Sequence, residues 1–206
     1  MALTKVIGNG LGTLGDGTAN DTKIVFDGNA QDFHIGLDDS ADSLTIGLGS
    51  TLGTTSHMVI DSTGAITKPL QPAFLVMKSG AQSDIATGSG VNMTWDTERF
   101  DQNGDFASNT FTAPVTGKYL LAYNLYVNNL DSASNYYESY LWTSNRLYYT
   151  TIDPDFGQDN VYFSFVSSQV ADMDAGDTAY VGINQQSGTS QTDIATVSTF
   201  SGCLLA

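Results

Sequence analysis

Four short apolar runs recur at near-constant spacing in the first third of the chain. They begin at residues 24, 35, 46 and 58, which are 11, 11 and 12 residues apart. In each run the first and third residues are apolar, so they share one face of a strand whose side chains alternate. Glycine and small polar residues between the runs are typical of turns. The spacing therefore predicts a stack of short β-strands with one apolar face.

The composition of the chain changes near Lys68-Pro69. Residues 1–68 contain 11 of the 21 glycines but only two aromatic residues, whereas residues 69–206 contain the other 20 aromatic residues and all four prolines. A segment with so little aromatic surface offsets its ordering entropy poorly as a single copy. We therefore expect an intertwined oligomeric stem, with a flexible Gly-rich linker as the alternative. This division predicts an attachment arm over residues 1–22, a β-strand stem over residues 23–68 and a head over residues 69–206.

The head shows short apolar runs separated by turn-forming clusters, and no window has a sustained helical period. Eight or nine strands in such a length are typical of a β-sandwich or jelly roll. We predict an all-β protein, with a trimeric β-strand stem followed by a jelly-roll β-sandwich head. The expected head strands are Ala73–Met77, Val91–Trp95, Asn109–Thr112, Lys118–Val127, Tyr137–Thr143, Arg146–Ile152, Val161–Ser167, Thr178–Asn184 and Val197–Leu205.

Three motifs in the head resemble the globular domain shared by complement subcomponent q and the tumour-necrosis-factor superfamily. They occur in the family's order at Phe111–Tyr119 (FTAPVTGKY), Ala175–Val181 (AGDTAYV) and Thr199–Leu205 (TFSGCLL). The resemblance covers roughly residues 73–205. It implies a jelly roll that associates as a tight homotrimer around a three-fold axis.

Large apolar and aromatic residues are the candidates for the core and for a trimer interface. Five tyrosines cluster in residues 136–149, and aromatic side chains are enriched at protein interfaces. The stem contributes the first residue of each apolar run. The full set of candidates is Ile24, Ile35, Ile46, Met58, Tyr119, Tyr140, Trp142, Phe200 and Leu204.

Motifs in the first third resemble the stems of bacteriophage tail-fibre and related virion proteins. They lie at Met1–Gly12 (MALTKVIGNGLG), Asp32–Asp38 (DFHIGLD) and Val59–Ile66 (VIDSTGAI). The resemblance implies a virion fibre or spike that joins other virion proteins through its N-terminal arm and presents an adhesion head to a host receptor or glycan. The alternative is a capsid decoration protein that reinforces the phage shell. A trimeric binding module unrelated to phage is a third hypothesis.

Charge and hydropathy exclude several other classes of function. Seven Lys and Arg against 22 Asp and Glu give a net charge of −15, which disfavours nucleic-acid binding. No run reaches the ~20 apolar residues that cross a membrane. The first residues lack the apolar core of a signal peptide. We therefore expect synthesis in the host cytoplasm and a final location in the virion, without membrane insertion.

Candidate chemistry is sparse. Two histidines lie 57 − 34 = 23 residues apart, one cysteine is present, and no nucleophile elbow occurs. We therefore predict no catalytic residues, no cofactor and no enzyme activity. Asp153, Asp155 and Asp159 could offer oxygen ligands to calcium, although their loop lacks the glycine and terminal glutamate of an EF-hand. Some domains of the resembling family bind calcium, so a structural ion without an assigned site remains an open alternative.

Overall fold

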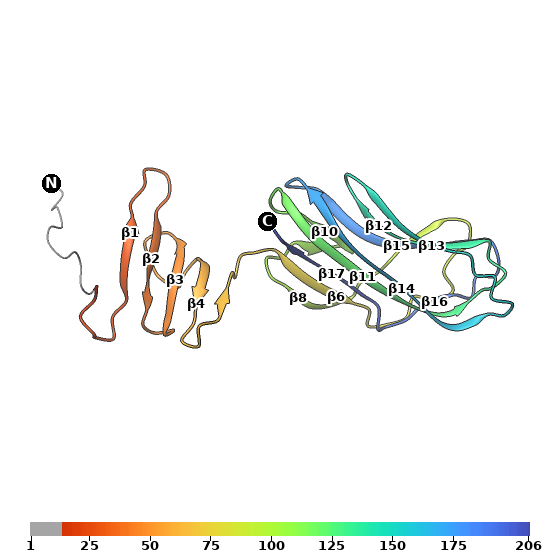
Figure 1. The fold of residues 1–206 in the computed structure, drawn as a ribbon, viewed down its shortest axis with the longest axis horizontal. Helices are drawn as coiled ribbons and strands as arrows, with labels where there is room; N and C mark the ends of the chain where they lie inside the picture. The colour runs from red at the N-terminus through yellow and green to blue at the C-terminus, as the bar shows by residue number, and fades with distance from the viewer. Residues whose placement is uncertain (1–13) are drawn as a thin grey trace. The chain divides into compact units, whose positions relative to one another are not determined.

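The computed structural model describes residues 14–206, and all regular secondary structure in this range is β-strand (Figure 1). The predicted all-β class is therefore confirmed. The chain forms two compact units that divide after Leu70. Within the described range no helix is long and apolar enough to cross a membrane. Residues 1–13 of the predicted attachment arm lie outside the described residues.

The first unit is a five-stranded antiparallel sheet, the stem sheet, in which each strand pairs with the next along the chain. All four apolar runs lie in its strands. The register places Ile24 opposite Ile35, Ile35 opposite Ile46, and Ile46 opposite Met58. The strands are β1 (Thr22–Phe26), β2 (Phe33–Asp38), β3 (Ser43–Leu48), β4 (Ser56–Ile60) and β5 (Ile66–Thr67).

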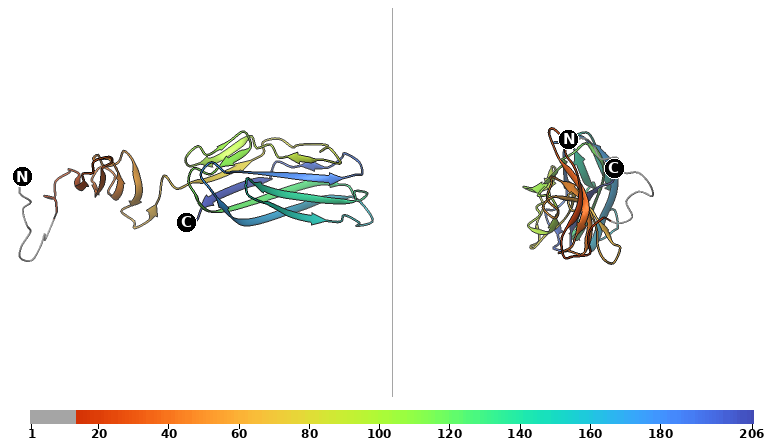
Figure 2. Two further views of the ribbon diagram at one scale, coloured as in Figure 1. Left: turned by 90° about the horizontal axis from the view of Figure 1, so that it is seen from above. Right: turned by 90° about the vertical axis from the view of Figure 1, so that its left-hand side faces the viewer.

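The second unit, the head, is a β-sandwich of two six-stranded sheets (Figure 2). Its strands are β6 (Ala73–Met77), β7 (Gly90–Asn92), β8 (Thr97–Asp101), β9 (Phe106–Ala107), β10 (Thr110–Thr112), β11 (Gly117–Leu130), β12 (Tyr136–Thr143), β13 (Leu147–Ile152), β14 (Asn160–Met173), β15 (Thr178–Gln186), β16 (Asp193–Ile194) and β17 (Thr199–Leu204).

The two sheets of the head exchange strands in the manner of a jelly roll. Sheet I has the order β13-β12-β15-β10-β9, with β7 beside β15. Sheet II has the order β14-β11-β17-β6-β8, with β16 beside β11. The chain passes from β11 in sheet II to the β12–β13 hairpin in sheet I, returns to β14 in sheet II, and crosses again to β15. The predicted jelly-roll head is therefore confirmed.

The core of the head lies between the two sheets and is rich in aromatic rings. Phe74 stacks on Phe111 with 4.8 Å between ring centroids and meets Phe200 edge-on at 5.0 Å. Gly202 makes this packing possible, because a Cβ at that residue would lie 2.7 Å from the Phe74 ring and 2.6 Å from Leu121. Side chains of both neighbouring strands, Leu121 of β11 and Phe74 of β6, thus pack against β17 at Gly202.

Each of the nine expected head strands has a counterpart in the structure, but three strands were not expected. β9 and β16 have two residues each, and three of the five residues of β8 are charged, so these strands carry little of the apolar periodicity that marks a strand. β14 also continues to Met173 rather than ending at Ser167, because the polar residues Ser168 and Gln169 keep pairing with β11. Pairing with a long neighbour, not local composition, extends this strand.

Replacing Phe200 with alanine should lower the free energy of unfolding by about 3–5 kcal/mol, because its ring is fully buried among Phe74, Trp95 and Phe106. The matched control is Phe156→Ala, since Phe156 is 46% exposed. Urea unfolding followed by tryptophan fluorescence measures both. Equal losses for the two variants would show that β17 does not close the core.

Candidate functional site

The outward face of sheet II carries little charge along its central strands. Outward side chains of β14, β11, β17 and β6 lie side by side in rows, and the Lys118–Asp172 row at one end is the charged row among them. Two more charged residues border these rows: Arg99 of β8 donates from Nε to the Met77 Sδ at 3.1 Å, and Asp193 of β16 pairs with Asn128. Val166 and Val170 on β14 are 64% and 58% exposed. We call this surface the sheet II face; the rest of it consists of Tyr162, Ser164, Ser168, Leu120, Ala122, Asn124, Tyr126, Asn128, Thr199, Ser201, Cys203, Ala73, Leu75 and Met77.

Such a surface is unusual for a chain with a net charge of −15, and depletion of charge is characteristic of the centre of a protein interface. Two asparagines lie on it. The Oδ1 atoms of Asn124 and Asn128 are buried by the chain itself and have no hydrogen-bond partner within it. A buried acceptor without a donor costs free energy, and a donor from another molecule reaches these atoms only if the side chains turn outward.

The outward face of sheet I carries an aromatic cluster instead. Trp142 and Tyr180 lie opposite each other on β12 and β15, with nearly parallel rings 5.9 Å apart. Tyr140 contacts Tyr149 edge-on at 6.3 Å, and its ring lies directly over Gly182, where any side chain would overlap it. Burial against the sheet raises the pKa of the Tyr140 hydroxyl. Trp142 remains 45% exposed.

The head residues predicted for the core or interface therefore separate into groups. Tyr119 and Phe200 are fully buried in the core, and Leu204 is half-buried beside it. Tyr140 and Trp142 lie on the outward face of sheet I. Trp142 is not a core residue, because side chains alternate along β12 and its neighbours Leu141 and Thr143 occupy the inward positions. The hairpin tyrosines divide in the same way, with Tyr137 in the core and Tyr149 exposed.

The loops of the head gather at two ends. Leu204 donates its backbone N–H to the carbonyl of Pro72, so the chain enters the head beside its last strand, at what we call the proximal end. β11 starts there and finishes at Leu130, at the opposite, distal end (Figure 1). The loops over residues 131–135, 153–159 and 187–192 therefore lie at the distal end.

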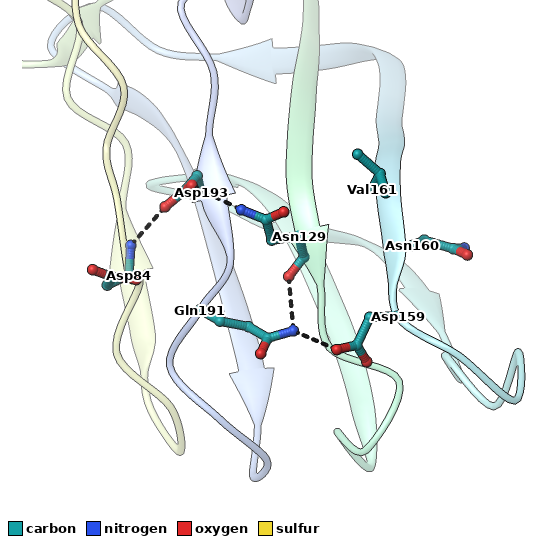
Figure 3. A pocket seen from close by; sticks show the side chains of 7 residues that line it. All are labelled: Asp84, Asn129, Asp159, Asn160, Val161, Gln191 and Asp193. Carbon is teal, nitrogen blue, oxygen red and sulfur yellow. Dashed lines mark hydrogen bonds between the residues drawn. The ribbon is translucent and has the colours of Figure 1, made fainter.

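A polar pocket of about 390 Å³ opens at the distal end (Figure 3). Asp193 accepts hydrogen bonds from the backbone N–H of Asp84 at 3.0 Å and from the Asn129 side chain at 3.3 Å. The Gln191 amide donates to Asp159 at 2.9 Å. The bond from Gln191, together with those from Ser132, lowers the pKa of the Asp159 carboxyl. Asn160 and Val161 complete the lining.

Buried hydrogen bonds hold the distal loops in place beneath this pocket. Asp131 is almost fully buried and accepts from the backbone N–H groups of Ala133 and Thr189, which ties two loops together. The Tyr137 hydroxyl bonds to Thr192 at 2.7 Å. Preorganised loops lose little conformational entropy on binding, so the distal end is suited to recognition.

The predicted calcium ligands are not brought together. Asp153 accepts a hydrogen bond from the backbone of Asp155 within the β13–β14 loop, whereas Asp159 belongs to the pocket wall. Over residues 14–206 no group of three or more His, Cys, Asp or Glu side chains is placed to hold a metal ion. Asp84 and Asp193, which line the pocket with Asp159, are 109 residues apart in sequence, and no local motif marks them.

The two-sheet jelly roll defines the fold class of the head, and domains of this fold serve several functions. The C1q domain family model matches residues 73–205, and the chain belongs to this family. Domains of the C1q type form trimers and act as binding modules. The predicted family is therefore confirmed for the head.

Two solved structures illustrate the similarity. The globular domain of zebrafish complement 1qA is 16% identical with a TM-score of 0.47, and the match covers 66% of this chain and 98% of that one. Murine APRIL is 12% identical with a TM-score of 0.49, covering 66% and 99%. Comparison with curated proteins finds no significant match.

Replacing Gly182 with alanine should destabilise the head by about 1–3 kcal/mol, because the new methyl group would displace the Tyr140 ring from sheet I. Gly80→Ala is the control, since no atom lies within 4 Å of a Cβ at that residue. Thermal unfolding followed by near-ultraviolet circular dichroism would detect both the lost stability and the moved ring. Unchanged values for Gly182→Ala would contradict the described packing.

Proposed function

We propose that this protein is a homotrimeric structural protein of a bacteriophage virion, in which the head binds a host surface receptor or glycan through its distal loops. The observation that carries the proposal is the layout of the head. Its chain enters at the proximal end, whereas the polar pocket and the tied loops lie at the distal end. A segment preceding the head can therefore anchor it without covering the distal loops.

The sheet II face is the surface that we assign to the head trimer. It is uncharged across four strands, and it exposes Val166 and Val170. Burial of this face would remove exposed apolar area from water, which drives association.

The double substitution Val166→Asp and Val170→Asp should convert the trimer into monomers, because it places two carboxylates in an interface that excludes water. Val197→Asp is the matched control, since Val197 is also exposed but lies between β16 and β17. Multi-angle light scattering at micromolar concentration distinguishes 21.9 kDa monomers from trimers. A double variant that stays trimeric would exclude the sheet II face as the interface.

Attachment to the virion is assigned to the N-terminal arm, by pairing of its backbone with a strand of another virion protein. Removing residues 1–20 should leave a folded trimer that no longer joins particles. Mass spectrometry of purified virions measures incorporation, and light scattering of the free protein provides the control for assembly. Incorporation at the normal level would place the attachment elsewhere.

Capsid decoration, in which the same trimer reinforces the phage shell, is the second candidate function. Immunogold labelling of intact particles separates the two candidates. Gold on the tail supports host attachment through a fibre or spike. Gold spread over the capsid supports decoration, and the absence of gold from particles would contradict both.

A further inference from the structure

The stem sheet has one face made almost entirely of apolar side chains. Residues of β1 to β5 that alternate toward this face stand opposite one another in the register, and Thr22 is the polar member of these paired rows. None of these paired residues is charged. His57, the extra residue at the irregularity of β4, contacts the Phe33 ring edge-on at 6.0 Å and adds a polar ring at the border of the face. We call this surface the stem face; its apolar members are Ile24, Phe26, Phe33, Ile35, Leu37, Leu44, Ile46, Leu48, Met58, Ile60 and Ile66.

The stem face is uncovered in the single chain. Phe26 and Ile66 are 59% and 58% exposed, and Phe33, Leu37 and Leu44 are also exposed. An antiparallel sheet that exposes one face to solvent normally directs its polar side chains toward that face. Contiguous apolar surface of this kind marks an interaction site.

The opposite face of the same sheet is polar, yet it is the face that the chain covers. His34 and Thr45 are almost fully buried there, and the Nδ1 atom of His34 lies 2.9 Å from the carbonyl oxygen of Gly49 in the β3–β4 loop. Gly53 of this loop passes so close to Asp38 that a Cβ would lie 2.9 Å from its carboxylate. The loop therefore protects the polar face and leaves the apolar face open.

We infer that the stem face is covered by the stem faces of two further copies of this chain, so that three sheets enclose a dry three-sided prism. The inference rests on the proposed homotrimer. Only residues 68–72 connect β5 to β6, so a trimeric head holds three stems within about 20 Å of their entry points. Such tethering gives effective concentrations in the millimolar range. The absence of charge on the face also offers nothing that would select a charged partner.

The register further predicts which rows meet in the prism. β1, β2 and β3 each place three residues on the face, one in the middle and one toward each edge. The middle residues Ile24, Ile35 and Ile46 form a row that Met58 of β4 continues. In a three-fold arrangement this middle row lines the axis. Contacts around a three-fold axis are heterologous. The edge of the stem face that carries Phe33 in one copy therefore packs against the edge that carries Leu37 in the next copy.

Disulfide trapping in the full chain tests this arrangement. In a Cys203→Ser background, the pair Phe33→Cys and Leu37→Cys should link three chains into a covalent ring on mild oxidation, and Leu44→Cys with Leu48→Cys should do the same one strand along. Non-reducing gels measure the product. Each single cysteine variant is the matched control, because one cysteine per chain can join two chains at most.

The outcomes separate the inference from the proposed function. Covalent trimers from the pairs, but not from the single variants, support the prism. A parent that is trimeric by light scattering but gives only monomers or dimers with both pairs overturns the prism and leaves the proposed function standing. A monomeric parent overturns both.

A charge on the axis provides a second readout. Ile35→Asp should raise hydrogen exchange in β2–β4 by about tenfold or more while the head stays protected, whereas Leu14→Asp, outside the stem sheet, should not. Equal exchange in the two variants overturns the inference.

Discussion

The pairing of β11 with β14 is the interaction on which the head depends. The two strands are bonded from Gly117–Met173 to Leu130–Asn160, and β11 also pairs with β17 and β16 on its other side. This pairing places Leu121, Leu125 and Phe165 in the core. Because side chains alternate, the same pairing necessarily sends Val166 and Val170 to the outward face. The core and the exposed apolar side chains of the outward face are thus two consequences of one register.

Side chains also alternate along the strands of the stem sheet, but this unit has only one layer. One sheet has no second layer to bury its apolar side, so alternation produces an open apolar face instead of a core. The loop over residues 49–55 covers the other side, where His34 and Leu52 are buried. Both units therefore present an uncharged surface, and both surfaces are suited to self-association. The head would supply proximity, and the stem would add contact area along the chain.

The distal pocket depends on a different kind of interaction. Asp159 comes from the β13–β14 loop, whereas Gln191 and Asp193 belong to one segment that continues into β16, and hydrogen bonds of their side chains hold the pocket wall together. Asp131 beneath them binds backbone N–H groups of two loops. This arrangement keeps polar groups at the distal end in fixed positions although they are exposed to solvent.

The sequence by itself determined most strands of both units and the family of the head, but not the short strands β5 and β9 or the strands β8 and β16. The runs beginning at Ile24, Ile35, Ile46 and Met58, and motifs such as TFSGCLL, are local patterns, and strand formation follows local alternation. Only the tertiary structure decided which face of each strand is covered. It placed Trp142 at the surface, and it brought Asp84 to Asp193. Alternation within a strand defines two faces, but burial of either one depends on layers and loops that are distant in sequence.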